Sequence, residues 1–285
     1  MTTHKVSSIN VDHIPVIWVE PENFTAPVHL VIWMDGFTGN KERMRPFLAT
    51  LAASGFVALS FDAFQHGERA TERPEQFISR IAGNYRRHFW PILGQTILDT
   101  TRIIDWATAN LKVFSDDVLM GGISMGGDVA IAASGIDRRI KCVAAMLATP
   151  DWLRPGMKEY ANPSIEFAQG EADSYAKFFY DRFNPLTNLE SFSHLPEITF
   201  ECGAQDTLVP PDGALRFQEA LNSLYKQEAN RLRVNLHENA GHDPTIPKMW
   251  QNCLEWFTSH RERIRAGEGD RFERQGRLDA TRHDR

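Results

Sequence analysis

One serine in the chain has neighbours that favour nucleophilic catalysis. Ser124 lies in the run Gly122-Ile123-Ser124-Met125-Gly126, after a short apolar stretch and before an Ala-rich stretch typical of a helix. A serine on so sharp a turn between strand and helix can be presented to a substrate, and the flanking glycines leave the clearance that the turn needs. The start of the helix would direct free N–H groups toward a developing oxyanion. The pattern predicts Ser124 as a nucleophile.

A serine hydroxyl needs a base within hydrogen-bond reach, and the base needs an orienting acid. Asp206 follows the strand-type run Glu197–Cys202, and His242 follows the strand-type run Leu232–His237. In open sheets of parallel strands, ligands bind at the carboxyl ends of the strands. We therefore predict that His242 acts as the base and that Asp206 orients it.

Three other residues could fill these roles but fit less well. Asp151 also follows a strand-type run, but it comes one strand too early for the usual order of serine, acid and histidine. His237 lies within its strand pattern, and His66 is interpreted mainly as a structural loop histidine.

An oxyanion hole requires two hydrogen-bond donors, because the tetrahedral intermediate places a full charge on one oxygen. The N–H of Met125, directly after the nucleophile, is one predicted donor. The other should come from the loop that follows the apolar strand Val28–Met34, and we predict the N–H of Phe37.

The elements that must position these residues alternate between strand and helix. This alternation predicts an α/β fold with a mostly parallel sheet covered by helices on both faces. The expected strands are two edge strands before Glu20, then Val28–Met34, Phe56–Phe61, Asp117–Met120, Cys142–Ala148, Glu197–Cys202 and Leu232–His237. The expected helices are Met44–Ser54, about Pro91–Leu111, Asp128–Ser134, about Gly213–Ala229 and about Ile246–Ile264.

The same rhythm predicts how the chain is divided. Residues 1–265 are expected to form one domain, in which residues of about 151–196 interrupt the alternation as an insertion. Residues 266–285 are rich in charged side chains and almost devoid of large apolar ones. Such a segment cannot bury enough surface to order itself, so we predict a tail without stable order.

Composition argues against several classes of protein. A net charge of -6 over 285 residues offers no basic field for nucleic acid. The start lacks an apolar signal-peptide core, and no apolar run is long enough to span a bilayer, so a cytoplasmic protein is expected. The three cysteines are far apart and no short metal-binding spacing appears, which predicts buried thiols and neither metal nor cofactor. The oligomeric state cannot be predicted.

Several motifs taken together resemble a known group. They are Phe37-Thr38-Gly39-Asn40-Lys41-Glu42, the segment from Asp62 through His66-Gly67-Glu68-Arg69, the Ser124 turn, and the Asp206 and His242 loops. This set resembles the small bacterial serine carboxylesterases of the α/β-hydrolase superfamily, which are related to dienelactone hydrolases and to the prolyl-oligopeptidase hydrolase domain.

The resemblance implies an α/β-hydrolase fold with a helical cap insertion, and cofactor-free cleavage of small carboxylic esters through an acyl-enzyme. Because some esterases of this kind open the lactone ring of macrolide antibiotics, a bulky natural-product ester or lactone is a further expectation, and with it a role in antibiotic resistance. Two residues depart from the pattern. Asp35 stands where the family usually has histidine, and Ser124 stands where dienelactone hydrolases have cysteine.

Five residues are predicted to contact the substrate. The insertion is rich in aromatic side chains that could form an apolar roof over the site. The predicted contacts are Trp152, Tyr160 and Phe178 from the insertion, with His66 and Asp35 from the loops after strands.

Acidic residues near the same edge of the sheet suggest that the site distinguishes esters by their charge. Asp35, Glu68 and Asp151 would form a negative rim that disfavours anionic esters and tolerates neutral or cationic ones.

Two other functions remain open at this point. The same triad cleaves amides, so an acyl-peptidase or amidase is one alternative. A catalytically silent binding protein of the same fold is the other, although a pure binder would have no need for a complete triad.

Overall fold

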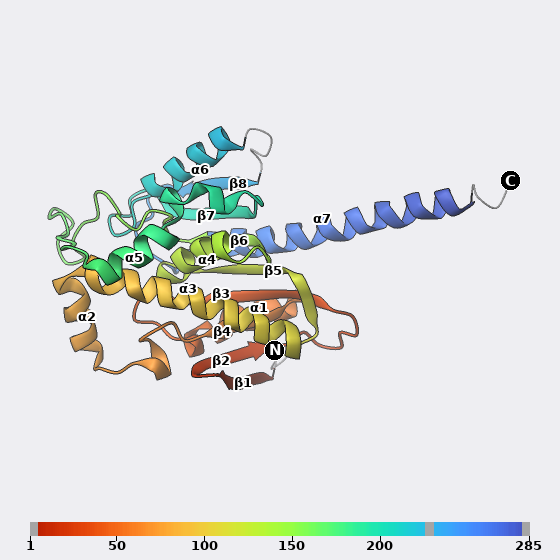
Figure 1. The fold of residues 1–285 in the computed structure, drawn as a ribbon, viewed down its shortest axis with the longest axis horizontal. Helices are drawn as coiled ribbons and strands as arrows, with labels where there is room; N and C mark the ends of the chain where they lie inside the picture. The colour runs from red at the N-terminus through yellow and green to blue at the C-terminus, as the bar shows by residue number, and fades with distance from the viewer. Residues whose placement is uncertain (1–4, 226–230, 281–285) are drawn as a thin grey trace.

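The structure, a computed structural model, describes residues 5–225 and 231–280, with side chains described as far as residue 267. Its centre is an eight-stranded sheet in the order β1-β2-β4-β3-β5-β6-β7-β8, shown in Figure 1. The pairs β1–β2 and β2–β4 are antiparallel, and all other neighbours are parallel. The strands are β1 Val6–Val11, β2 Ile14–Val19, β3 Val28–Met34, β4 Val57–Phe61, β5 Val113–Ile123, β6 Ile140–Met146, β7 Glu197–Gly203 and β8 Leu232–His237. The predicted mostly parallel sheet is confirmed.

Helices cover both faces of the sheet, as the apolar strands require. Alternate residues of β3 point to opposite faces, so that Leu30 and Ile32 join one buried cluster while Val31 and Trp33 join the other. The first cluster includes residues of α3 (Tyr85–Asn110), α4 (Met125–Ile136) and α6 (Asp212–Leu224); the second includes residues of α1 (Arg45–Ala53) and α7 (Pro247–Ala280).

The long helix on the first face begins earlier than the sequence suggested. We expected it to start at about Pro91, because apolar residues recur at helical spacing from there to Leu111. In the structure α2 (Pro74–Gly83) is followed directly by α3, and the side chain of Asn84 accepts a hydrogen bond from the Arg87 N–H to cap the start of α3. Pro91 therefore lies inside a helix whose start is marked by the Asn84 cap.

The segment between β6 and β7 packs on α3. It contains α5 (Ser174–Phe183) and short 3-10 helices at Pro185–Thr187 and Leu189–Phe192. Phe179 fills the space over Gly94, and Tyr180 stacks on Trp90 with ring centroids 4.5 Å apart. The interruption of the strand–helix rhythm is confirmed, whereas the division into one domain with a cap remains a prediction.

At the C-terminal end, α7 continues to Ala280 and projects from the body of the molecule in Figure 1. The predicted tail of residues 266–285 overlaps this helix, and its last five residues lie outside the described residues, so the predicted lack of order remains a prediction. Residues 226–230, the end of the predicted helix to Ala229, also lie outside them.

The structure also bears on the expected buried thiols and on the expected lack of a membrane-spanning helix. Cys142, Cys202 and Cys253 are free and buried, as predicted. Among the helices of the described residues, none is both long and apolar enough to cross a membrane.

Candidate active site

The nucleophile candidate occupies a strained turn between β5 and α4. Ser124 has φ 52° and ψ −118°, a backbone conformation that costs a residue with a Cβ on the order of 1–3 kcal/mol and persists only where its surroundings impose it. Here the Ser124 N–H donates to the Met146 carbonyl at 2.8 Å, and its carbonyl accepts from the Asp128 N–H at 3.0 Å. Ser124 is half-buried at the carboxyl end of the sheet.

The glycines around this turn allow the loop after β3 to come close to it. A Cβ on Gly126 would lie 2.5 Å from the Met34 carbonyl oxygen, and one on Gly122 would lie 2.7 Å from the same atom. A Cβ on Gly36 would lie 3.4 Å from the Ser124 Cβ. The predicted need for clearance is confirmed, and the loop that carries Phe37 lies against the nucleophile turn.

The structure brings His242 and Asp206 together with Ser124. His242 Nε2 lies 3.0 Å from Ser124 Oγ, and His242 Nδ1 lies 2.7 Å from Asp206 Oδ2. Because a carboxylate accepts only, Nδ1 carries the proton and Nε2 is left as the acceptor that faces the serine hydroxyl. This is the proton arrangement that a general base requires.

Asp206 is held in place through its second oxygen. Asp206 Oδ1 accepts from the Leu208 N–H at 2.9 Å and from the Val209 N–H at 2.8 Å. The side chain is almost fully buried, whereas 20% of the His242 side chain is exposed. The acid is therefore fixed within the protein, and the base faces the side from which a substrate can approach.

Direct backbone contact aligns the loops that carry these two residues. The Gln205 N–H donates to the Ala240 carbonyl at 2.8 Å. Gly203 ends β7 beneath the histidine loop, where an added Cβ would lie 2.4 Å from the Gly241 carbonyl oxygen. The parallel pair β7–β8 thus sets the separation of the acid and the base.

Two N–H groups next to Ser124 are available as donors. Within the described residues, neither the Phe37 N–H nor the Met125 N–H makes a hydrogen bond to another protein group. Met125 begins α4, so its N–H is among the helix-end donors that have no partner within the helix. Their placement suits the predicted oxyanion hole, and that role remains a prediction.

Asp35 organises its own loop. Its carboxylate accepts from the Gly36 N–H at 2.8 Å and from the Asn40 N–H at 3.1 Å, and lies 3.3 Å from Arg43 Nε. Burial raises the pKa of Asp35, and these contacts oppose the rise. The hydrogen bonds of the Asp35 carboxylate thus hold the loop that follows β3. A contact between Asp35 and the substrate remains a prediction.

The motifs that follow β3 and β4 are joined by an ion cluster in which Lys41 and Asp62 are buried and Glu68 is exposed. The Lys41 N–H donates to Asp62 Oδ1 at 2.9 Å, its Nζ donates to Asp62 Oδ2 at 3.1 Å, and the same Nζ binds Glu68. The Glu68 N–H closes the cluster on Asp62 Oδ2 at 2.9 Å. This cluster holds the loops of Phe37 and His66 side by side.

His66 lies beside the predicted oxyanion loop. Its Nδ1 donates to the Phe64 carbonyl at 2.9 Å, so the buried Nε2 is an acceptor, and it has no partner within the described part of the chain. Burial lowers the pKa of His66. The ring packs edge-on against Phe37, with centroids 5.8 Å apart, and lines a cavity of about 10 Å³ together with Asp35 and Met125. These contacts hold the ring within its loop, and a role in lining the substrate pocket remains a prediction.

The three aromatic residues predicted to roof the site lie in different environments. Trp152 is buried in the core, where its backbone N–H donates to Asn184 Oδ1 at 2.8 Å. Tyr160 is 84% exposed and Phe178 is 54% exposed. The structure therefore does not gather them into a single apolar wall, and their role as substrate contacts remains a prediction.

Each carboxylate of the predicted negative rim lies beside a cationic side chain. Asp35 pairs with Arg43, Glu68 pairs with Lys41, and Asp151 lies 2.7 Å from Arg216 Nη2. Lys41 also pairs with Asp62, and Arg216 also pairs with Asp212, so the cations reduce the negative field of the rim without cancelling it. A preference for cationic esters remains a prediction.

A buried ion pair near the site was not predicted. Asp128, four residues after the nucleophile on α4, is fully buried; it accepts from the Thr149 N–H at 2.7 Å and from Arg154 Nη2. The Arg154 guanidinium lies over the rings of Tyr85 and Phe89, 5.7 and 5.5 Å from their centroids. A single acid in an otherwise apolar helix is the sequence signal that could have indicated a buried partner.

Comparison with known proteins defines the family. Residues 84–262 match the model of the prolyl oligopeptidase family. The chain therefore belongs to the prolyl oligopeptidase family, and the predicted α/β-hydrolase relationship is confirmed.

Individual relatives cover most of the chain. The YitV protein of Bacillus subtilis (strain 168) is 27% identical over 259 residues, which cover 85% of this chain and 93% of YitV. Esterase YjfP of Escherichia coli (strain K12) is 25% identical over 224 residues, which cover 76% and 85% of the two chains. The crystal structure of TT1662 from Thermus thermophilus has the same fold, with a TM-score of 0.72 at 23% identity, and covers 91% of this chain and 98% of TT1662.

Proposed function

We propose that this protein is a serine hydrolase that cleaves small carboxylic esters through an acyl-enzyme. The observation that carries the proposal is the unbroken chain of contacts from Ser124 Oγ through His242 to Asp206, at 3.0 and 2.7 Å. The N–H groups of Phe37 and Met125, which have no partner among the described residues, lie on the two loops beside Ser124. Membership of the prolyl oligopeptidase family and similarity to the esterase YjfP support it.

In the acylation step, Ser124 Oγ attacks the ester carbonyl carbon while its proton passes to His242 Nε2. Asp206 stabilises the imidazolium that forms, and the negative carbonyl oxygen accepts hydrogen bonds from the Phe37 and Met125 N–H groups. When the tetrahedral intermediate collapses, the bond to the alcohol oxygen breaks and His242 gives its proton to the departing alcohol.

Deacylation repeats these steps with water as the nucleophile. His242 Nε2 takes a proton from water, the resulting hydroxide attacks the acyl carbonyl, and the oxyanion returns to the same two donors. Collapse breaks the bond to Ser124 Oγ, which regains the proton, and the carboxylic acid leaves. Every proton transfer uses groups of the protein or the solvent, so none requires a cofactor.

The packing around the oxyanion loop favours a short acyl group. The Phe37 ring contacts Phe77 and Phe89, with centroids 5.2 and 5.7 Å apart, and both of these rings are buried. The adjoining cavity of about 10 Å³ has room for little more than one water molecule. A long acyl chain on this side would have to displace packed aromatic rings, which makes acetate to butyrate esters the expected substrates.

The test combines an active-site probe with a panel of substrates. A fluorophosphonate should label the wild type and the control variant Ser8→Ala, which changes an exposed serine on β1. It should not label Ser124→Ala. Nitrophenyl esters of two to four acyl carbons should be hydrolysed faster than those of eight or more.

The same panel separates the alternatives. A nitroanilide with the same acyl group should be cleaved at least about 100-fold more slowly than the ester, and the reverse order would make the protein an amidase. Macrolide lactones, followed by mass spectrometry, test the larger substrate that the family resemblance suggested. A wild type that is neither labelled nor active on any member of the panel would indicate a catalytically silent binding protein.

A further inference from the structure

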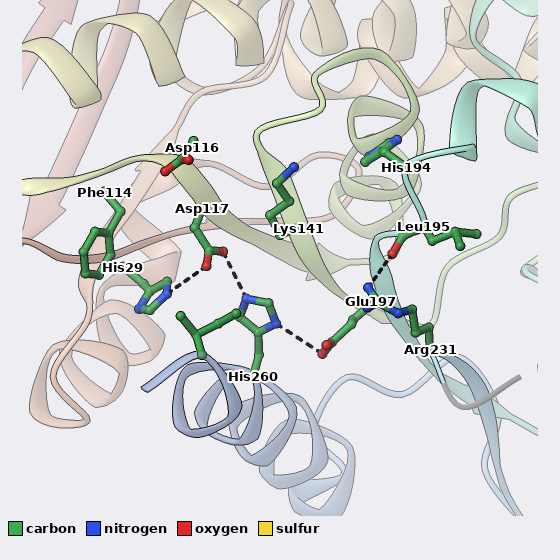
Figure 2. A pocket seen from close by; sticks show the side chains of 11 residues that line it. His29, Phe114, Asp116, Asp117, Lys141, His194, Leu195, Glu197, Arg231 and His260 are labelled. Carbon is green, nitrogen blue, oxygen red and sulfur yellow. Dashed lines mark hydrogen bonds and ion pairs between the residues drawn. The ribbon is translucent and has the colours of Figure 1, made fainter. Parts of the chain in front are cut away.

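A second group of ionisable side chains meets at the opposite edge of the sheet. His29 lies at the start of β3 and His260 lies on α7, and both rings point to Asp117 of β5, as Figure 2 shows. Ser124 lies beyond the other end of β5, and the stretch of β3 from His29 to Met34 spans roughly 17 Å at about 3.3 Å per residue. The chemistry proposed for Ser124 uses none of these groups.

The three side chains turn their ligand atoms toward one another. His29 Nε2 lies 3.2 Å from Asp117 Oδ2, and His260 Nε2 lies 3.0 Å from Asp117 Oδ1. One ligand atom from each residue lies within 4.8 Å of the other two. The ligands of a tetrahedral zinc ion, at 2.0–2.1 Å from the metal, are about 3.3 Å apart, so small side-chain shifts would suffice to bind one.

A neutral His260 ring cannot satisfy both of its carboxylate neighbours. Its Nδ1 lies 3.2 Å from Glu197 Oε2 but outside hydrogen-bond geometry, while Nε2 faces Asp117. A neutral imidazole has a single N–H, so it would turn one lone pair toward a carboxylate. Burial lowers the pKa of His260, but Asp117 and Glu197 outweigh that effect and raise it to about 9, so without a metal a second proton occupies the place that an ion would take. A ring bound to a metal through Nε2 keeps its proton on Nδ1, where Glu197 can accept it, and this is a common arrangement around zinc.

The surroundings leave space for an ion and for further ligands. His29 and His260 are nearly fully buried, and together with Asp117 they line a cavity of about 350 Å³. Water could complete the coordination from that side. Lys141 and Arg231 line the cavity as well, and Arg231 donates to the Leu195 carbonyl at 3.0 Å.

From this geometry we propose that His29, Asp117 and His260 bind one divalent transition-metal ion, with zinc as the best match to two imidazoles and one carboxylate. Glu197 orients His260 from behind. The ion links β3, β5 and α7 at the amino edge of the sheet, so its role is to stabilise the fold.

The experiment uses the full chain without a histidine tag, stripped of metal and then titrated with Zn²⁺ by calorimetry. We expect one equivalent to bind. At 100-fold excess over the dissociation constant, the melting temperature should rise by about 5 °C. Co²⁺ in place of Zn²⁺ should give visible absorption bands that report the coordinated imidazoles.

Two variants and a control assign the site. Asp117→Asn and His29→Asn should each weaken Zn²⁺ binding at least about 30-fold, whereas His13→Ala, at an exposed turn, should bind like the wild type. The kcat of the wild type for a nitrophenyl ester should stay within about twofold when Zn²⁺ is added, which separates this site from the proposed active site.

Three outcomes would overturn the proposal. One is the absence of stoichiometric Zn²⁺ binding, which would leave a network of imidazoles and carboxylates held by protons alone. Another is binding that survives in both Asn variants. The third is binding that is lost in His242→Ala with Asp117 intact, which would place the ion at the proposed triad.

Discussion

A single methyl group at Gly203 should damage catalysis without unfolding the protein. Gly203 ends β7, and an alanine Cβ there would lie 2.4 Å from the Gly241 carbonyl oxygen and 2.6 Å from that of Ala240. Ordinary contact begins at 3.4 Å, so the histidine loop must retreat by about 1 Å. Gly203 is not among the residues with positive φ, so alanine meets no backbone penalty of that kind.

The retreat changes the distances on which proton transfer depends. His242 directly follows Gly241, and its ring now spans 3.0 Å to Ser124 and 2.7 Å to Asp206. A misplacement of about 1 Å can cost about 100-fold in rate, equivalent to about 2.7 kcal/mol of transition-state stabilisation. The overpacking should lower the free energy of unfolding by about 1–3 kcal/mol. We therefore expect kcat to fall about 100-fold with little change in KM.

The matched control is Gly83→Ala, since a Cβ at Gly83 would have no atom of the described residues within 4 Å beyond its own helical turn. Steady-state kinetics with a nitrophenyl acetate substrate and thermal unfolding would be measured for both variants. The reasoning is refuted if Gly203→Ala remains folded and keeps more than half of the wild-type kcat. It is also refuted if the two alanine variants lose activity to the same degree.

Three further changes test other parts of the structure. Asp206→Asn keeps an oxygen that can accept from the loop N–H groups, but it presents an NH₂ to His242 and so favours the wrong tautomer of the ring. We expect kcat to fall about 10⁴-fold while the melting temperature stays almost unchanged. A loss of kcat below tenfold would contradict the role assigned to Asp206. Arg154→Met leaves Asp128 buried without its cationic partner and should lower the free energy of unfolding by about 3–5 kcal/mol in denaturant titrations. The double variant Arg154→Met/Asp128→Leu should regain much of this loss. An equal loss of unfolding free energy in the single and double variants would count against a buried ion pair. Burial lowers the pKa of His66 in the folded protein. As the pH falls below about 6.5, the unfolded chain therefore binds a proton at this ring that the folded chain does not bind, and the free energy of unfolding declines. His66→Gln should make this decline between pH 7 and 5 shallower, and an unchanged slope would argue against a buried neutral imidazole.

Features that depend on short stretches of sequence could be predicted well. The strand Val28–Met34 agrees with β3 at both ends, because a fully buried parallel strand is a continuous apolar run. The turn at Ser124 is marked by its own glycines. The order of Ser124, Asp206 and His242 along the chain was sufficient to predict that they converge, since each follows a strand whose carboxyl end lies at the same edge.

Features that depend on partners far apart in sequence could not be predicted. Asp35 and Asp151 looked like a source of negative field, and only the folded chain shows Arg43 and Arg216 beside them. The pairing of Asp128 with Arg154 joins α4 to the segment after β6 across an interface that has no periodicity of its own.

The cluster at the amino edge escaped prediction for a related reason. A search for metal ligands at short spacing cannot find His29, Asp117 and His260, which are separated by 88 and 143 positions. These residues begin or precede the buried parts of their strands, or lie on a helix, so no loop motif marks them. Parallel strands bring their amino ends together as well as their carboxyl ends, so ligand residues can gather at either edge of such a sheet.

Helix α7 connects these two edges and explains why the histidine loop should respond sharply to a change at Gly203. The helix begins five residues after His242, and its residues Met249 and Phe257 are fully buried against the sheet. The loop is therefore held by β8 on one side and by a packed helix on the other, and it cannot move as a unit. A methyl group that pushes on Gly241 must then be absorbed within the few residues between these two anchors. The side chain most exposed to that distortion is His242.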